Sequence, residues 1–160
     1  MALELMPAYA FPNEIRSLFS EYTEMLSAGD HSFQQYLDIQ HYDAELEHPD
    51  AKYGLPDGRL YIAFWNGEPV GCIGLRKLDD QNCEMKRLYV RHAYRGRHIG
   101  SRLVRQIIQD AKEIGYAHML LDTLPFLKRA IHMYKACGFY EIASYNGNPM
   151  PTLVYLKLDL

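Results

Sequence analysis

Residues 89–103 read YVRHAYRGRHIGSRL, and this stretch decides how the second half of the chain is interpreted. An apolar strand ends here, a basic turn with Gly96 and Gly100 follows, and an amphipathic helix begins. Backbone N–H groups at a helix N-terminus bind anions when the turn allows close approach, and Arg95 and Arg97 add positive charge. The stretch therefore predicts a pyrophosphate site, with a plain strand–helix turn and solvated arginines as the alternative. Its spacing matches neither the P-loop lysine motif nor GxGxxG.

The segments on either side of this turn have clear periodicity. The following helix carries apolar residues on one face and charged residues on the other, up to a glycine cap at Gly115. The preceding strand, CEMKRLYV at 83–90, breaks strict alternation because Lys86 and Arg87 are adjacent polar residues in an apolar frame. A β-bulge that re-aims these side chains would reconcile the two halves of the strand.

The remaining segments predict a mixed order of helices and strands. The expected elements are a strand at 3–6, a helix from Pro12 to Asp30, a second helix with Phe33, Tyr36, Leu37 and His41, strands at 60–65, 70–75 and 118–122, a helix from Pro125 to Gly138, and closing strands at 139–145 and 152–158. Asn66-Gly67 is a hairpin signal. This order indicates an α/β sandwich around a mixed sheet, not a doubly wound nucleotide fold.

The composition excludes several classes of function. The 160 residues fit one domain, and the net charge of −3 gives no bulk electrostatic case for nucleic acid. The positive charge is local, between Arg87 and Arg105, and favours a small anionic ligand. Three cysteines without CxxC spacing indicate free thiols in a reducing compartment. Because neither a basic leader nor a run of about 18 apolar residues is present, no membrane contact is expected and the predicted location is the cytoplasm.

The turn also carries a family motif. Residues 95–100, Arg-Gly-Arg-His-Ile-Gly, resemble the Gln/Arg-x-x-Gly-x-Gly/Ala acetyl-CoA motif of the GNAT family of N-acetyltransferases. The strand MKRLYV and the later segment LDTLPFLKRAIHMYKACGFYEI are similar to family sequence as well, so the resemblance covers roughly residues 60–145. Two positions depart from the pattern. His98 stands where the family has its first glycine, and Leu127 stands where many members carry an asparagine that touches the cofactor.

The resemblance implies a fold and a binding site. Residues 1–160 would form a single N-acetyltransferase domain, with a mixed, mostly antiparallel sheet, a splayed central strand pair and flanking helices. The pyrophosphate of acetyl-CoA would bind the backbone of residues 95–101, which includes Ile99 and Ser101. The pantetheine arm would pair with the backbone of Leu88 and Val90. No metal is implied.

The resemblance also implies acid–base groups. Glu84 would be the base, acting through water, and Tyr134 the acid that protonates the leaving thiolate. The alternatives are a strand-surface carboxylate paired with Lys86 and an aromatic on the apolar face of a helix. Residues 31–58 and 145–151 are expected to build the acceptor site.

The acceptor side of the chain carries weaker signals. His31, His41 and His48, with Asp43, Glu45 and Glu47, fit no metal-ligand spacing. Those carboxylates either attract a cationic amine or form a solvated face. The leading interpretation is acetyl transfer from acetyl-CoA to a primary amine of a small molecule by direct attack in a ternary complex. The alternative is a catalytically silent acyl-CoA sensor. No nucleic-acid partner is expected, and a homodimer is allowed.

Overall fold

The structure is a computed structural model, and it describes residues 2–29, 42–148, 150 and 152–160. In this part of the chain a seven-stranded sheet has the order β1-β2-β3-β4-β5-β7-β6. The strands are β1 (Leu3–Pro7), β2 (Arg59–Trp65), β3 (Glu68–Lys77), β4 (Asn82–Val90), β5 (His118–Thr123), β6 (Tyr140–Ile142) and β7 (Val154–Asp159). β4 and β5 pair in parallel and the other described pairs are antiparallel, as predicted for a mixed, mostly antiparallel sheet.

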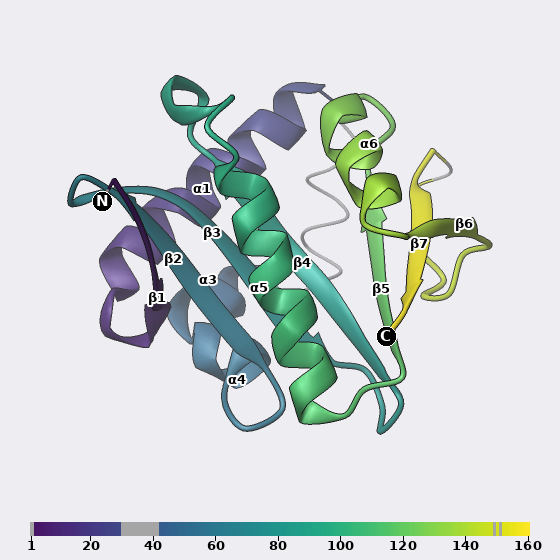
Figure 1. Cartoon of the computed structure of the whole chain (residues 1–160). Helices are drawn as coiled ribbons and strands as arrows, with labels where there is room; N and C mark the ends of the chain where they lie inside the picture. Colours follow the sequence, from purple (N-terminus) through teal and green to yellow (C-terminus); the bar gives the residue numbers. More distant parts are fainter. Residues whose placement is uncertain (1, 30–41, 149, 151) are drawn as a thin grey trace.

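Helices cover both faces of the sheet (Figure 1). They are α1 (Pro12–Gly29), α3 (Tyr42–Glu47), α4 (Pro49–Tyr53), α5 (Ile99–Ile114) and α6 (Lys128–Ala136), with short 3-10 turns at Ala8–Ala10 and His92–Tyr94. α5 is the crossover between the parallel strands β4 and β5, as the sequence predicts. None of the helices in the described ranges has the length and apolar character that a membrane span requires.

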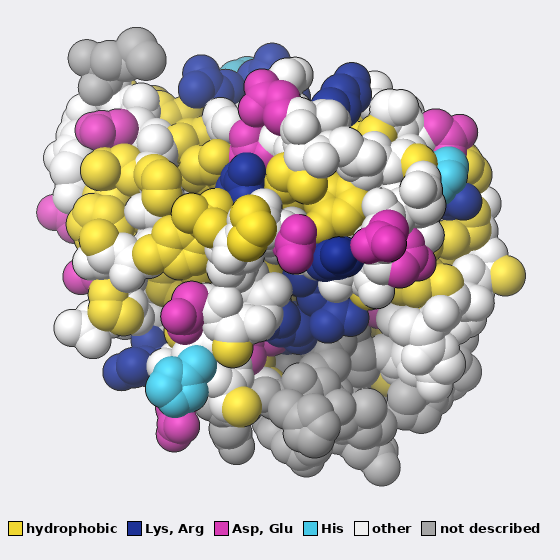
Figure 2. All heavy atoms as spheres, turned by 90° about the horizontal axis from the view of Figure 1, so that it is seen from below, with side chains coloured by type: hydrophobic (Ala, Val, Ile, Leu, Met, Phe, Trp, Pro, Cys, Tyr) yellow, Lys and Arg dark blue, Asp and Glu magenta, His cyan; other side chains and the backbone are white. Residues whose placement is uncertain are grey.

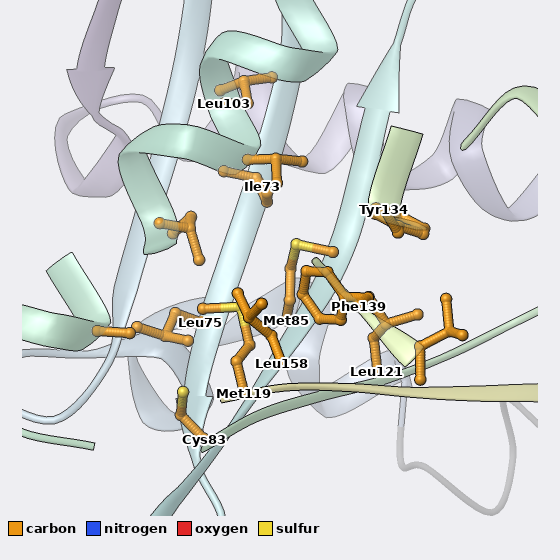
Figure 3. Packing of buried hydrophobic residues seen from close by; sticks show 14 of the residues in the cluster. Ile73, Leu75, Cys83, Met85, Leu103, Met119, Leu121, Tyr134, Phe139 and Leu158 are labelled. Atoms are coloured by element: carbon orange, nitrogen blue, oxygen red, sulfur yellow. The ribbon is translucent and has the colours of Figure 1, made fainter. Parts of the chain in front are cut away.

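Two apolar clusters hold these layers together. On one face, α5 packs Leu103, Val104 and Ile107 against β3, β4 and β5. Figure 3 shows residues of this cluster, which also includes Tyr134 and Phe139. On the other face, α1 buries Ile15, Leu18 and Phe19 against β2 and Cys72, together with Tyr53 of α4. The sheet is thus buried on both sides, which fixes the strand register and with it the side chains that border the site.

The predicted hairpin and the predicted bulge are both confirmed. Asn66 and Gly67 have φ of 49° and 84°, which is the positive-φ pair that a tight hairpin turn needs. Along the β3–β4 ladder, Cys72 pairs with Tyr89 but Gly74 pairs with Lys86, so one extra β4 residue is accommodated between them. Arg87, at φ 62°, takes up the irregularity. The bulge places two consecutive cationic residues on one side of the sheet.

Some boundaries differ from the prediction. The helix expected from Pro125 begins at Lys128, because Leu127 closes a turn onto the Leu124 carbonyl at 3.1 Å and has a non-helical ψ of 58°. β6 ends at Ile142 instead of continuing to 145, since Tyr145 leaves the strand and its hydroxyl donates to Glu84. The short helix α4 lies between the first expected helices and β2, where the sequence predicts no element. The helix expected around Phe33, Tyr36 and Leu37 lies outside the described residues.

The predicted solvated face is wrong for Glu45. Its side chain is buried between Arg87, which donates through Nε and Nη2, and Lys52, whose Nζ lies 2.8 Å away. Burial works to raise the pKa of this carboxyl, but the charge and hydrogen bonds of Arg87 outweigh it and lower the pKa to about 2. The pair joins α3 to the bulged part of β4.

We expect Glu45→Gln to lower the free energy of unfolding by about 3 kcal/mol or more at pH 7, because it leaves Arg87 buried with a weakened partner. Glu47→Gln, an exposed neighbour in α3, is the matched control and should change little. Urea unfolding measures both. The wild-type advantage should be complete above the ordinary pKa of 4.5 and decline as the pH falls toward 2, since the folded-state pKa is lowered. Equal losses in the two variants would contradict this account.

Candidate functional site

The central feature of the site is the early separation of β4 and β5. The two strands pair only at Asn82–His118, Cys83–Met119 and Glu84–Leu120, although β4 continues to Val90. This is the splayed strand pair that the resemblance implies. A groove of about 790 Å³ occupies the divergence, which is within the usual range for a small-molecule site. It is bordered by β4 from Met85 to Val90, the turn residues 94–96 and 98–101, the end of β5, the start of α6 and two residues of α1, Tyr22 and Met25.

The turn before α5 presents backbone donors to this groove. Gly96 has φ 82° and His98 has φ 61°, and α5 begins directly after them. The first helical hydrogen bond here runs from Arg102 N to His98 O at 3.1 Å, so the N–H groups before it have no acceptor within the helix. Gly96, His98, Ile99, Gly100 and Ser101 all line the groove. Their arrangement is that of an anion site.

The structure explains the histidine that replaces glycine in this turn. Its left-handed φ of 61° is a conformation that glycine adopts without cost and that most side chains avoid, and histidine is one of the residues enriched there. The turn therefore keeps the geometry that a glycine would give it, and its backbone N–H donors are not blocked.

Gly100 differs from Gly96 and His98, because the fold does not need a glycine there. Its φ lies outside the left-handed range, and a Cβ built there would meet only Val90 Cγ2, at 3.8 Å. Nothing among the described residues requires a glycine at this position. Because Gly100 also lines the groove, the absence of a side chain there leaves room for a ligand.

The two arginines of the turn separate. Arg95 lines the groove, and its Nε donates to the Val90 carbonyl at 3.0 Å. Arg97 is directed to aromatic rings instead, with its guanidinium carbon 4.8 Å from the Trp65 centroid and 5.4 Å from that of Tyr94. It is not among the residues that border the groove. The local positive charge at the turn therefore comes from Arg95, and Arg97 anchors the turn to the hairpin.

Tyr134 reaches the groove from α6, and Leu88 and Val90 reach it from β4. The tyrosine is 6% exposed and packs against Phe139, with ring centroids 5.8 Å apart. Burial raises the pKa of its hydroxyl well above the ordinary value, so the phenol stays protonated at neutral pH. Within the described residues its hydroxyl makes no protein hydrogen bond. It is a protonated donor beside an apolar groove.

Glu84 is not brought to the groove. Its carboxylate is 3% exposed and receives Arg76 Nε at 2.8 Å, the Tyr145 hydroxyl, and Lys86 Nζ at 3.7 Å. Burial works to raise the pKa of Glu84, but Lys86, the Tyr145 hydrogen bond and Arg76 together lower it. An ionised carboxylate with these partners is a weak base.

Charged residues that sequence reasoning did not assign to the site also border the groove, among them Lys86, Arg87 and Asp122. These three also line an adjacent small cavity of about 30 Å³, in which Tyr22 of α1 takes part. The signal in the sequence was present, because Lys86 and Arg87 interrupt an apolar strand and Asp122 ends another. Among residues 2–29 and 42–160, leaving aside 149 and 151, no group of three or more His, Cys, Asp or Glu side chains is arranged to hold a metal ion.

Comparisons with known proteins agree with this geometry. Residues 14–139 match the Acetyltransferase (GNAT) family. An uncharacterised N-acetyltransferase of Schizosaccharomyces pombe is 37% identical over 150 residues, which cover 92% of this chain and 88% of the relative. An acetyltransferase of Streptococcus agalactiae superposes with a TM-score of 0.79 at 21% identity, over 100% of this chain and 99% of that one. A GNAT family acetyltransferase of Elizabethkingia anophelis with acetyl-CoA bound superposes with a TM-score of 0.67 at 19% identity, over 99% of each chain.

We expect His98→Gly to keep or raise the free energy of unfolding by about 0.5–1 kcal/mol, because relief of the left-handed conformation exceeds the entropy that glycine adds to the unfolded chain. Arg102→Gly is the matched control. It sits in the first turn of α5 with an exposed side chain and should lose about 1 kcal/mol. Chemical denaturation measures both. A loss at position 98 as large as that at 102 would show that the imidazole makes a stabilising contact.

Proposed function

Because the chain belongs to the GNAT family of acetyltransferases, we propose that it transfers an acetyl group from acetyl-CoA to a primary amine of a small molecule. Residues 1–160 are proposed to act as a single domain, located in the cytoplasm, where its three unpaired cysteines would stay reduced. The observation that supports this most is the groove between β4 and β5, which is lined by both the donor-rich turn before α5 and Tyr134.

The residues present fit coenzyme A. The backbone of residues 95–101 and the side chain of Arg95 would hold the pyrophosphate, with space left by Gly100. The backbone groups of Leu88 and Val90 lie where β4 has left β5 and would hold the amides of the pantetheine arm. The Elizabethkingia anophelis structure, which has acetyl-CoA bound, supports this co-substrate for the same fold.

The proposed chemistry is direct attack in a ternary complex. The neutral amine nitrogen forms a bond to the thioester carbonyl carbon, the carbon–sulfur bond breaks, and the sulfur leaves with the electron pair. Tyr134 would donate its proton to that thiolate, which its raised pKa allows because the phenol remains protonated. The amine proton leaves through water. Glu84 is proposed to accept it there, and its ion pairs, which lower its pKa, make its contribution small.

We expect Gly100→Asp to abolish measurable CoA binding without loss of stability. The carboxylate would repel the phosphates and fill the space that the glycine leaves, while the fold itself has room for a Cβ there. Gln109→Asp adds the same charge at an exposed position further along α5 and serves as the control. Isothermal calorimetry gives the affinities, and thermal unfolding checks the fold. Wild-type affinity in a folded Gly100→Asp variant would overturn the site.

For Tyr134→Phe we expect kcat to fall by about 10–100-fold with little change in CoA affinity. This is the low end of general acid catalysis, because a thiol with a pKa of about 8.5 is already a fairly good leaving group. Tyr140→Phe removes a hydroxyl from an exposed residue of β6 and should leave kcat unchanged. Thiol release with a panel of amines provides the assay. A kcat near the wild-type value from pH 6 to 9 would show that Tyr134 only packs.

A further inference from the structure

The groove is bordered by tyrosines from both faces of the sheet. Tyr134 of α6 belongs to the apolar cluster on the face that α5 covers. Tyr22 of α1 packs against the cluster on the opposite face. Both tyrosines nevertheless line the same groove. Because β4 and β5 stop pairing after Glu84 and Leu120, the gap between the strands allows the groove to reach both faces.

The position of Tyr22 is fixed by α1 and by β4. Tyr22 lies one helical turn from Leu18 and one from Leu26, which are 0% and 2% exposed, so the three side chains share the face that packs on the sheet. The Tyr22 ring also lies beside that of Tyr89, with the centroids 6.0 Å apart. Tyr89 belongs to the part of β4 that has already left β5. The side chain of Tyr22 is therefore held at the opening between the strands.

The hydroxyl of Tyr22 has no structural role among the described residues. The Tyr9 hydroxyl donates to the Tyr53 carbonyl at 2.7 Å. The Tyr116 hydroxyl donates to the Asp57 carbonyl, also at 2.7 Å. The Tyr22 hydroxyl, in contrast, makes no hydrogen bond within the described part of the chain. Since a tyrosine hydroxyl in a packed site usually has a partner, this one is available to a ligand.

Tyr22 also lines the small cavity of about 30 Å³, which neither Tyr134 nor the turn before α5 lines. Four leucines border this cavity, and all of them belong to or pack against the apolar cluster on the α1 face: Leu26, Leu124, Leu127 and Leu153. The cavity is therefore the end of the site remote from the predicted pyrophosphate turn. Its volume suits a group of about the size of a water molecule, such as an amino group.

The charged residues that line the cavity have partners of their own. Arg87 Nη2 donates to Glu45 at 2.9 Å, and Asp122 Oδ2 accepts a hydrogen bond from Asn146 at 2.7 Å. Figure 2 shows Lys and Arg side chains in a hollow of one face of the molecule, with Asp and Glu side chains around it. Groups that already bind one another gain little from a neutral amine, whereas the Tyr22 hydroxyl can bind it without losing a partner.

We propose that Tyr22 binds the attacking amine: its hydroxyl oxygen accepts a hydrogen bond from an amine N–H and holds the nitrogen lone pair towards the thioester carbon. This rests on the proposed function and assigns a residue to its acceptor site. Tyr134, from the other face, acts on the leaving thiolate. No proton leaves Tyr22, because burial raises its pKa to about 12 and the hydroxyl stays protonated at neutral pH.

The first experiment removes this hydroxyl. A panel of amino acids, polyamines and arylalkylamines is assayed by thiol release with wild-type protein and acetyl-CoA, and the best acceptor is then used with Tyr22→Phe. The variant keeps the ring that packs on Tyr89. We expect kcat/KM for the amine to fall about tenfold, mainly through KM, while calorimetry gives an unchanged Kd for acetyl-CoA.

Tyr9→Phe is the matched control. It removes a tyrosine hydroxyl on the same face of the sheet, but this hydroxyl donates to a backbone carbonyl and its residue does not line the groove. The KM for the amine should keep its wild-type value in this variant. A rise equal to that in Tyr22→Phe would show that any loss of packing on this face weakens the acceptor, and would overturn the assignment of Tyr22.

Two further measurements define what the hydroxyl does. The ratio of wild-type to Tyr22→Phe activity should stay constant from pH 6 to 9, because the hydroxyl does not titrate there. The double variant with Tyr134→Phe should lose the product of the two single losses, since the two hydroxyls act on different groups. A ratio that grows with pH would make Tyr22 a base, and a double variant no worse than Tyr134→Phe would make it part of thiolate protonation. Either result would overturn the proposal.

The outcomes separate the role of Tyr22 from the function on which it rests. An unchanged amine KM in folded Tyr22→Phe would overturn that role and leave the proposed function standing. A weaker Kd for acetyl-CoA in this variant would place the hydroxyl on the cofactor and would overturn it as well. Failure to acetylate any amine of the panel, in wild-type protein shown by calorimetry to bind acetyl-CoA, would overturn the proposed function and this inference with it.

Discussion

The separation of β4 and β5 is the constraint on which the rest of the structure depends. Parallel strands usually continue their hydrogen bonds along the sheet, but here the pairing stops after Glu84 and Leu120. The remainder of β4 therefore has peptide groups on one edge without a strand partner in the described sheet. That edge, the start of α5 and the start of α6 enclose a single groove. A ligand with amide groups, which can form hydrogen bonds with these peptide groups, fits this opening.

Two local irregularities of the backbone, the turn before α5 and the bulge in β4, shape this opening. The left-handed residues of the turn, Gly96 and His98, direct α5 so that its first N–H groups face the groove. The bulge at Arg87 brings a second cation beside Lys86, and the buried pair of Arg87 with Glu45 ties α3 to the sheet. One strand thus serves two surfaces, with backbone donors on its edge and cations on its face. Both irregularities have a conformational cost, and both lie at the site, where strained residues are common in enzymes.

Much of this could be predicted from the sequence because the signals are local. The amphipathic period located α5, the Asn66-Gly67 pair located the hairpin, and the adjacent Lys86 and Arg87 located the bulge. The ends of the elements depend on tertiary contacts where these compete with local preference. Pro125 is a good first residue for a helix, yet the chain forms a turn there and α6 starts at Lys128. Tyr145 lies outside β6, and its hydroxyl donates a hydrogen bond to Glu84 instead.

The sequence by itself determined the order of elements, the donor-rich turn and the family, since periodicity, glycine positions and helix termini act over a few residues. Only the tertiary structure decided how the charges are used. In the folded protein, Glu45 is buried against Arg87, 42 positions away. Glu84 is bound by Arg76 and Tyr145. The guanidinium of Arg97 lies over the Trp65 ring, and Asp122 lies across the gap from Lys86. Such contacts depend on how helices pack on the sheet, and a side chain's charge does not reveal which partner the packing will bring to it.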